Sequence, residues 1–158
     1  MKTAIRVISV PTSVAESVRT TLRAPRYGHP AHTEIASGYG PCRHCLRYFS
    51  VGNERRILFT YDPFEGLEAL PLPGPVFVHA EPCVRYDESA GFPAELTEHA
   101  LTLVGYGCGR TLIAEEHLSA DADAEKVARD LLARSDVGYV HVRDTQAGCY
   151  DFRVERAR

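Results

Sequence analysis

The segment 38–45, which reads GYGPCRHC, holds two of the five cysteines of the chain, Cys42 and Cys45. Their thiols stand beside Arg43 and His44, and a nearby cation favours the thiolate, which is the form that attacks electrophiles and binds metals. A third cysteine, Cys149, lies in the motif GCY just before the C-terminus. Any chemistry of this chain is therefore expected at these cysteines. The residue types leave the kind of chemistry open.

One interpretation of the C-x-x-C formed by Cys42 and Cys45 is a redox-active dithiol. Such a pair depends on a helix N-terminus or a cation that stabilises one thiolate. The order of predicted elements before it, strand, helix and strand, is superficially similar to thioredoxin. However, residues 46–51 make a poor helix, and the chain ends in a predicted hairpin where thioredoxin ends in a helix. The motif is informative only in its fold context, which here disfavours a redox role.

A second interpretation is a zinc site in which Cys42 and Cys45 join His79 and Cys83, which form an H-x-x-x-C. Thiolates and imidazole are the ligands of tetrahedral zinc, and four protein ligands make a closed, structural site. The weakness of this interpretation is that 33 residues separate Cys45 from His79. Ligand types without close spacing are weak evidence for a metal site.

A third interpretation is packing, because free cysteine often behaves as a small, inert, buried hydrophobe. This is the role expected of Cys83 and Cys108. An odd number of cysteines also excludes a framework in which every thiol is paired in a disulfide.

The C-terminal segments 137–144 and 149–155 are predicted to form a β-hairpin. Alternation along the first strand places Tyr139, His141 and Arg143 on one face. The register decides what they meet on the second strand, because a one-residue slip moves every side chain to the other face.

Two registers of this hairpin stay open. A four-residue loop pairs Asp144 with Cys149 and places His141 beside Tyr150 and Phe152. A loop one residue shorter or longer places His141 with Cys149 and Asp151, which would give a Cys-His-Asp cluster.

The elements that must position these residues indicate an α+β fold in one domain, residues 1–158. Runs of strands interrupted by few helices are typical of a mainly antiparallel sheet. A helix is predicted from Ser13, with a Ser13–Glu16 capping box, and a second from Pro93 to His99. The third and clearest, 121–134, has one apolar stripe. Strands are predicted at 2–10, 32–36, 55–62, 75–79, 101–106 and 111–116, before the hairpin.

Composition narrows the function classes. The net charge of −3 and the pI of about 6.2 argue against nucleic acid, which is usually bound by a clustered basic face. No window approaches the ~20 apolar residues of a membrane span, and residues 1–10 lack the apolar core of a signal peptide. We therefore expect a cytoplasmic protein with mostly reduced thiols and no membrane partner.

Three segments carry a resemblance to a known family: GPCR at 40–43, LPGPVFV at 72–78, and YVHVRD at 139–144 followed by GCY at 148–150. In this order and spacing they resemble an uncharacterised bacterial family, domain of unknown function 1203. The resemblance implies a small, single-domain bacterial protein and supplies no activity. The matching positions are Cys42, Arg43, Gly74, Pro75, Tyr139, His141, Gly148, Cys149 and Tyr150.

The leading functional hypothesis is a pocket for a small, anionic molecule in which Cys42 and Arg43 approach Cys149 and Tyr150, with His141 on the adjoining strand. Arg43 would bind a carboxylate or phosphate, and Tyr150 would donate a hydrogen bond. If the protein is an enzyme, which the sequence leaves open, Cys42 or Cys149 would be the nucleophile and His141 the base. Tyr139 would add a wall of the pocket.

The rival hypotheses need no pocket. In a structural protein the cysteines are buried, Arg43 pairs with an acid such as Asp151, and the protein acts through a partner surface or as a homodimer. The leading hypothesis expects no cofactor and no metal. In the alternative of a metal protein, zinc would be bound by the four ligands Cys42, Cys45, His79 and Cys83.

Overall fold

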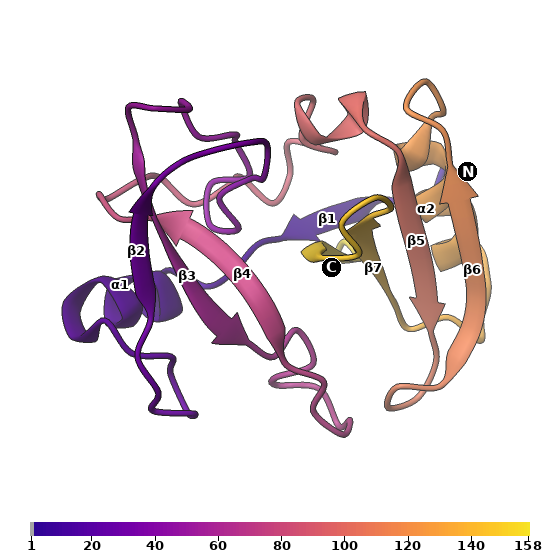
Figure 1. Ribbon diagram of the computed structural model, residues 1–158. Helices are drawn as coiled ribbons and strands as arrows, with labels where there is room; N and C mark the ends of the chain where they lie inside the picture. Colours follow the sequence, from indigo (N-terminus) through magenta and orange to yellow (C-terminus); the bar gives the residue numbers. More distant parts are fainter. Residues whose placement is uncertain (1) are drawn as a thin grey trace.

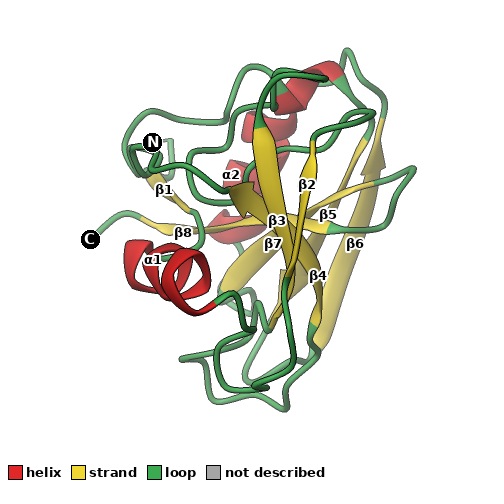
Figure 2. Ribbon diagram, turned by 60° about the vertical axis from the view of Figure 1, so that its left-hand side comes forward, coloured by secondary structure: helices red, strands yellow, loops and turns green. Residues whose placement is uncertain are grey.

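The computed structural model describes residues 2–158, which form two antiparallel β-sheets and two α-helices. The strands of the larger sheet lie in the order β1-β8-β7-β5-β6, and those of the smaller in the order β2-β3-β4. The two sheets stand side by side in Figure 1, with α1 beside the smaller sheet and α2 behind the larger. In Figure 2 the smaller sheet lies in front of the larger one.

The five-stranded sheet has one face covered by α2 (Ala124–Ala133). The apolar stripe of α2 packs on side chains such as Val142 and Phe152, which are fully buried. Asp123 caps this helix by accepting a hydrogen bond from the Lys126 backbone N–H, at 3.0 Å. The strands are β1 (Ile5–Ile8), β8 (Tyr150–Arg156), β7 (Tyr139–Asp144), β5 (Leu101–Tyr106) and β6 (Leu112–Leu118).

The three-stranded sheet consists of β2 (His32–Ile35), β3 (Arg55–Tyr61) and β4 (Gly74–His79). Alternation along β3 and β4 directs one apolar set into a second core cluster, to which α1 (Thr12–Thr21) contributes Val18. The members of this set are Ile57, Phe59, Val76 and Val78.

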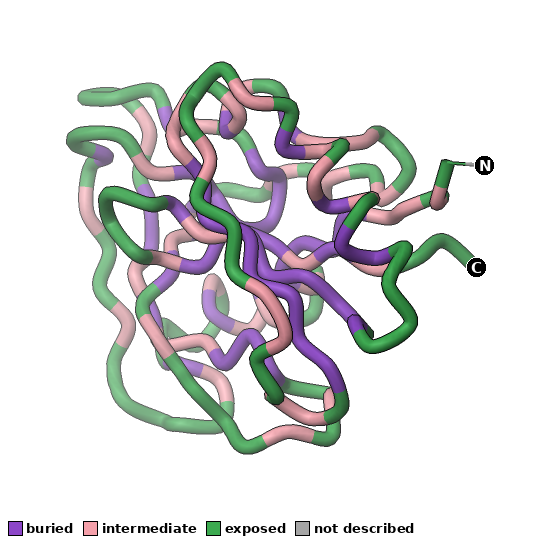
Figure 3. The backbone as a smooth tube through the Cα atoms, turned by 90° about the vertical axis from the view of Figure 1, so that its right-hand side faces the viewer, coloured by how far each residue is buried: buried purple, intermediate pink, exposed green. Residues whose placement is uncertain are grey.

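The loop between β3 and β4 covers part of the other face of the large sheet. Phe64, on this loop, is buried against Tyr106 and Tyr139 in a third core cluster. The buried stretches of chain run through the middle of the molecule in Figure 3, and the exposed loops surround them. None of the helices within residues 2–158 is long and apolar enough to cross a membrane.

The predicted α+β class with antiparallel pairing is confirmed, but the structure has two sheets and two α-helices where three helices were expected. The third, predicted over 93–99, is a single 3₁₀ turn, Leu96–Glu98. Fewer than eight residues separate Pro93 from β5, and so short a helix forms too few hydrogen bonds to offset its nucleation. The predicted capping box is also wrong, because α1 begins at Thr12 without a side-chain cap.

Candidate metal centre

Four potential metal ligands converge at one end of the smaller sheet. The ligand atoms of Cys42, Cys45, His79 and Cys83 all lie within 4.8 Å of one another. These are the four residues that the sequence suggested as zinc ligands. The three thiols and one imidazole therefore form one cluster, although 33 residues of chain separate its two halves.

The first two ligands are held in a tight turn. Pro41 and Tyr48 form an isolated antiparallel bridge that closes the base of the turn. Within it, the Cys42 N–H donates to the carbonyl of Arg47, at 2.9 Å, and the Leu46 N–H donates to the carbonyl of Cys42, at 2.8 Å. Leu46 takes a positive φ of 56°, a conformation uncommon for a branched residue, so the surrounding contacts must fix it. The turn thereby brings both sulfur atoms to one side.

The other two ligands come from the end of β4 and the segment that follows. His79 is the last residue of β4, and Cys83 lies in the irregular stretch 80–88. The Arg43 N–H donates to the carbonyl of Phe77, at 2.8 Å, and so joins the turn to β4. The Tyr86 N–H donates to the carbonyl of His44, at 3.0 Å, and joins the irregular stretch to the same turn.

Two of the distances between ligand atoms are close to those of tetrahedral coordination. Zn–S bonds of about 2.3 Å and Zn–N bonds of about 2.0–2.1 Å place two sulfurs about 3.8 Å apart and a sulfur and a nitrogen about 3.5 Å apart. The Cys42 and Cys83 Sγ atoms are 3.9 Å apart, and Cys45 Sγ is 3.5 Å from His79 Nδ1. The widest separation in the cluster, 4.8 Å, exceeds these values, so the ligands must move closer together to hold a zinc-sized ion.

The polar groups around the ligands also suit a metal. The side chain of His79 directs Nδ1 toward the sulfurs, while its Nε2 lies 2.9 Å from a carboxylate oxygen of Glu54. Histidines that bind metals usually make such a contact through the other ring nitrogen, which fixes the tautomer and raises ligand basicity. The backbone N–H of His79 donates to Cys42 Sγ, at 3.3 Å.

Cys83 receives two further contacts. Its Sγ lies 3.0 Å from His44 Nδ1 and 3.2 Å from Nη2 of Arg19. His44 Nε2 is in turn 2.9 Å from the hydroxyl of Thr12. A guanidinium and an imidazole so placed stabilise negative charge on sulfur.

The ionisation of the cluster follows from these contacts. Hydrogen bonds from the thiols of Cys42 and Cys45, followed by those from the histidines, lower the pKa of Cys83. Hydrogen bonds with Cys42 and Cys83, together with burial, raise the pKa of Cys45. Hydrogen bonds to the same two thiols raise the pKa of His79 to about 10. The first thiolate thus forms easily beside an imidazolium, and further ionisation needs another positive charge, which a divalent cation supplies.

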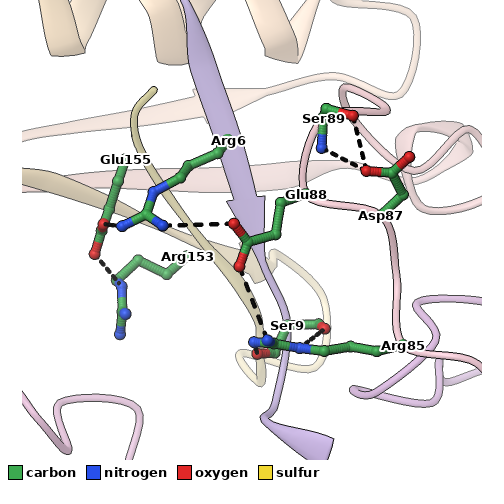
Figure 4. Close-up of polar contacts among 8 residues, drawn as sticks. All are labelled: Arg6, Ser9, Arg85, Asp87, Glu88, Ser89, Arg153 and Glu155. Carbon is green, nitrogen blue, oxygen red and sulfur yellow. Dashed lines mark hydrogen bonds and ion pairs between the residues drawn. The ribbon is translucent and has the colours of Figure 1, made fainter. Parts of the chain in front are cut away.

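The stretch that carries Cys83 is tied to β1 on its far side. Arg85 donates to the carbonyl of Ser9, at 2.7 Å, and lies 3.8 Å from Glu88. Glu88 pairs with Arg6, which also pairs with Glu155. Figure 4 shows these contacts as one network between β1, β8 and the segment 85–89. The network fixes the end of the stretch beyond Cys83.

The guanidinium of Arg43 contacts only groups of the protein itself among the described residues, two carbonyls and one carboxylate. Arg43 is 3% exposed, and its guanidinium donates to the carbonyls of Tyr150, at 2.9 Å, and Pro41, at 2.7 Å. The third nitrogen lies 3.4 Å from Asp151, which is 2% exposed. Burial raises the pKa of Asp151 to about 6, and the charge of Arg43 opposes that shift. The pairing of Arg43 with Asp151 is the arrangement expected for the structural alternative.

The hairpin adopts the four-residue loop, with the Asp144 N–H donating to the carbonyl of Cys149, at 3.0 Å. A β-bulge then changes the register, because Val142 pairs with Phe152 and Arg143 with Tyr150. Tyr150 therefore lies beside His141, with ring centroids 4.9 Å apart, while Phe152 joins the core under α2.

The Cys-His-Asp cluster of the alternative register does not form. The ring of His141 is fully buried among Phe64, Tyr106, Tyr139 and Tyr150. Neither of its nitrogens has a hydrogen-bond partner among residues 2–158. Burial, followed by the charges of Arg143 and Arg153, lowers the pKa of His141 to about 2.

This burial predicts an acid-sensitive contribution of His141 to stability. An unfolded-state pKa of about 6.5 lies above the folded value, so the unfolded chain binds more protons between these limits and stability falls as the pH falls. We expect the free energy of unfolding of the His141→Met variant, relative to that of wild type, to rise by about 2 kcal/mol as the pH falls from 7 to 5. Denaturant unfolding of both proteins at each pH measures this difference. Parallel pH profiles would contradict it. Asp151, whose raised pKa acts in the opposite direction, is common to both proteins and cancels.

Cys149 lies apart from the thiol cluster, on a groove between the hairpin loop and the smaller sheet. Its thiol is half-buried and contacts the carbonyl of Ala147, at 3.8 Å. Two hollows of about 290 and 240 Å³ meet there and share Pro75, Ala147 and Cys149. Their walls come from all three segments that carry the family resemblance. Of the predicted pocket residues, Arg43, Cys149 and Tyr150 line the hollows. Cys42 belongs to the ligand cluster, and Tyr139 and His141 lie together in the aromatic core.

The packing role expected of Cys83 and Cys108 is wrong, because Cys83 lies in the ligand cluster and Cys108 is exposed. Sequence reasoning also missed Glu54, Arg19 and the sulfur contact of His44. The position of His44 inside the C-x-x-C was a visible signal. The contact of Glu54 with His79 can be predicted only when the pairing of β3 with β4 is known. Glu54 directly precedes β3, and Arg56 of that strand lies opposite His79. Arg19 is one of 16 arginines in the chain, and nothing in its sequence context distinguishes it.

Comparison with known proteins gives one match. The model of the family described as "Protein of unknown function (DUF1203)" matches residues 39–156. No curated protein and no solved structure matches the chain. The matched span contains the turn of Cys42, the end of β4, the irregular stretch with Cys83, and the hairpin of Cys149. Because it covers well over half of the sequence, the chain belongs to the DUF1203 family of proteins of unknown function.

Proposed function

We propose that this protein binds one zinc ion through Cys42, Cys45, His79 and Cys83, and that the ion has a structural role. The observation that carries the proposal is the convergence of four ligand atoms within 4.8 Å. Four protein ligands leave no open coordination position, which is the arrangement of structural zinc sites. Thiolate ligands also fit a reducing cytoplasm, where they escape disulfide formation.

The backbone around Cys83 supports a structural role. Residues 81–85, all within the described part of the chain, make no backbone–backbone hydrogen bond. Val84, next to Cys83, is 87% exposed. A zinc ion would join this weakly bonded stretch to the turn at Cys42 and to β4. It would thereby replace the hydrogen bonds that a regular element would provide.

Metal content and affinity test the proposal. We expect purified protein to contain one equivalent of zinc, and Cys45→Ala to lose it. Glu54→Gln removes the carboxylate partner of His79 and should weaken zinc binding about 10-fold, the lower end for such groups because Glu54 is 42% exposed. Competition with a chromogenic chelator measures both effects.

Glu81→Gln is the matched control for Glu54→Gln. Glu81, like Glu54, lines a surface hollow beside the cluster, but it pairs with Arg55 rather than with a ligand. Its substitution should leave zinc affinity unchanged. Metal-free protein, or equal weakening by both substitutions, would contradict the proposal.

A second proposed function, independent of zinc, is the binding of a small molecule in the groove at Cys149. The supporting observation is that all three family segments meet there around two adjoining hollows. The guanidinium of Arg43 is occupied, and side chains such as Leu58 and Phe77 line the larger hollow. We therefore propose an apolar ligand in place of the anionic one that the sequence suggested.

Two maleimides with the same reactive group test this groove. N-benzylmaleimide should modify Cys149 about 10-fold faster than N-methylmaleimide, because a benzyl group held in the groove gains about 1.4 kcal/mol. Cys108, exposed on a loop, is the reference thiol and should react with both at similar rates. Equal rate ratios at the two cysteines, measured by peptide mass spectrometry, would remove the proposal.

A further inference from the structure

The three thiols of the metal cluster differ in their access to solvent. Cys42 is fully buried and Cys45 is 7% exposed, whereas Cys83 is half-buried. A surface hollow of about 650 Å³ lies over the cluster and is lined by Cys45, His79 and Cys83. A small polar oxidant therefore meets the sulfur of Cys83 first.

The surroundings of Cys83 also favour a second step. Its Sγ lies 3.9 Å from that of Cys42, and a disulfide of about 2.05 Å needs an approach of about 2 Å. Residues 81–85 make no backbone–backbone hydrogen bond that would resist this movement, and the side-chain contacts of Arg85 restrain the stretch at its end. Cys42 and Cys45, by contrast, share a turn that hydrogen bonds hold in shape, so a disulfide between those two would distort it.

From these observations we infer that Cys83 is an oxidation site for hydroperoxides, and that its oxidation ejects the metal by forming a Cys42–Cys83 disulfide. This inference rests on the proposed zinc site. The inference assigns a reaction to the thiolate of Cys83, which would be inert in a purely structural zinc centre.

The reaction balances in two steps with hydrogen peroxide as the oxidant. The Cys83 thiolate attacks one peroxide oxygen; an S–O bond forms, the O–O bond breaks, and hydroxide leaves, which gives a sulfenic acid. The Cys42 thiolate then attacks the Cys83 sulfur; an S–S bond forms, the S–O bond breaks, and a second hydroxide leaves. Two electrons pass from the two thiolates to peroxide. Zinc keeps only Cys45 and His79 and dissociates.

The test uses full-length, zinc-loaded protein with its zinc measured at the start. A starting content near zero would overturn the proposed zinc site itself, and the inference with it. With one equivalent bound, peroxide should release that equivalent to a chromogenic chelator, at the same rate as peptide mapping shows the Cys42–Cys83 disulfide. Dimedone present during the reaction should label Cys83 before any other ligand. A phosphine reductant with added zinc should restore the metal.

Two variants sharpen the result. Cys108→Ser/Cys149→Ser removes both cysteines outside the cluster and should release zinc at the wild-type rate. Cys83→His supplies an imidazole ligand without an oxidisable thiol, and should keep its zinc at least 10-fold longer. Zinc that stays bound while peroxide oxidises Cys108 would overturn the inference and leave the zinc site standing. Zinc release that accompanies a Cys42–Cys45 disulfide would overturn the inference in the same way.

Discussion

Removal of zinc by a strong chelator is expected to lower the free energy of unfolding by at least about 4 kcal/mol, the stabilisation given by a ligand present at a thousand times its dissociation constant. The physical reason is that the ligands come together only in the folded chain, so binding energy becomes folding energy. Hydrogen exchange should also accelerate in 41–48 and 80–88, the two segments that the metal would join. Denaturant unfolding with and without chelator measures the first effect.

The control for this experiment is the variant Cys108→Ser/Cys149→Ser, which leaves the cluster intact and should respond to chelator like wild type. Cys45→Ala should have reduced stability already and respond little to chelator. Identical unfolding curves of wild type with and without chelator would contradict a structural role for the metal.

Replacement of Arg43 by alanine is expected to destabilise the protein by about 3–5 kcal/mol, because it leaves Asp151 as an unpaired buried charge. The carbonyls of Pro41 and Tyr150 also lose their donors. Without the guanidinium the pKa of Asp151 should rise further above its present value of about 6. The folded state then holds a proton that the unfolded chain releases, so the destabilisation should grow as the pH rises from 5 to 8.

Two comparisons identify the source of this effect. Arg47→Ala, an exposed arginine of the same turn, should change stability by less than about 0.5 kcal/mol. Arg43→Met/Asp151→Leu removes both charges and should be more stable than Arg43→Ala. A cost of Arg43→Ala that is independent of pH, or a double variant no more stable than the single one, would show that the ion pair is not the cause.

Much of the fold is readable from alternation and turn residues. The pattern of β3 places Ile57 and Phe59 on the buried face, and the structure agrees. The limits of α2 follow from its apolar stripe. The packing of β2, β3 and β4 as a separate sheet was not readable, because strand patterns show which face is buried but not which strands are neighbours. The β-bulge, which leaves Asp151 without a paired residue on β7, could not be predicted either. A charged residue in a strand normally indicates a solvent-facing position.

The sequence predicts the ligands of the candidate site but not the residues that surround them. Cys42, Cys45, His79 and Cys83 could be proposed from residue type alone. Their proximity depends on a turn in which Leu46 takes a positive φ, and on the end point of β4. Neither has a sequence signature, because glycine is the usual residue where φ is positive. The pocket hypothesis treated Arg43 as free, whereas the structural alternative paired it with an acid such as Asp151. The structure contains this pair and adds the carbonyls of Pro41 and Tyr150, which the sequence did not indicate.

X-ray absorption at the zinc edge of the purified protein tests the central claim most directly. The proposed site predicts one zinc per chain, with three sulfur neighbours at about 2.3 Å and one nitrogen at about 2.0–2.1 Å. Cys83→His should change this shell to two sulfurs and two nitrogens. Protein that binds no zinc under reducing conditions, or zinc surrounded only by oxygen and nitrogen, would contradict the assignment of Cys42, Cys45, His79 and Cys83 as its ligands.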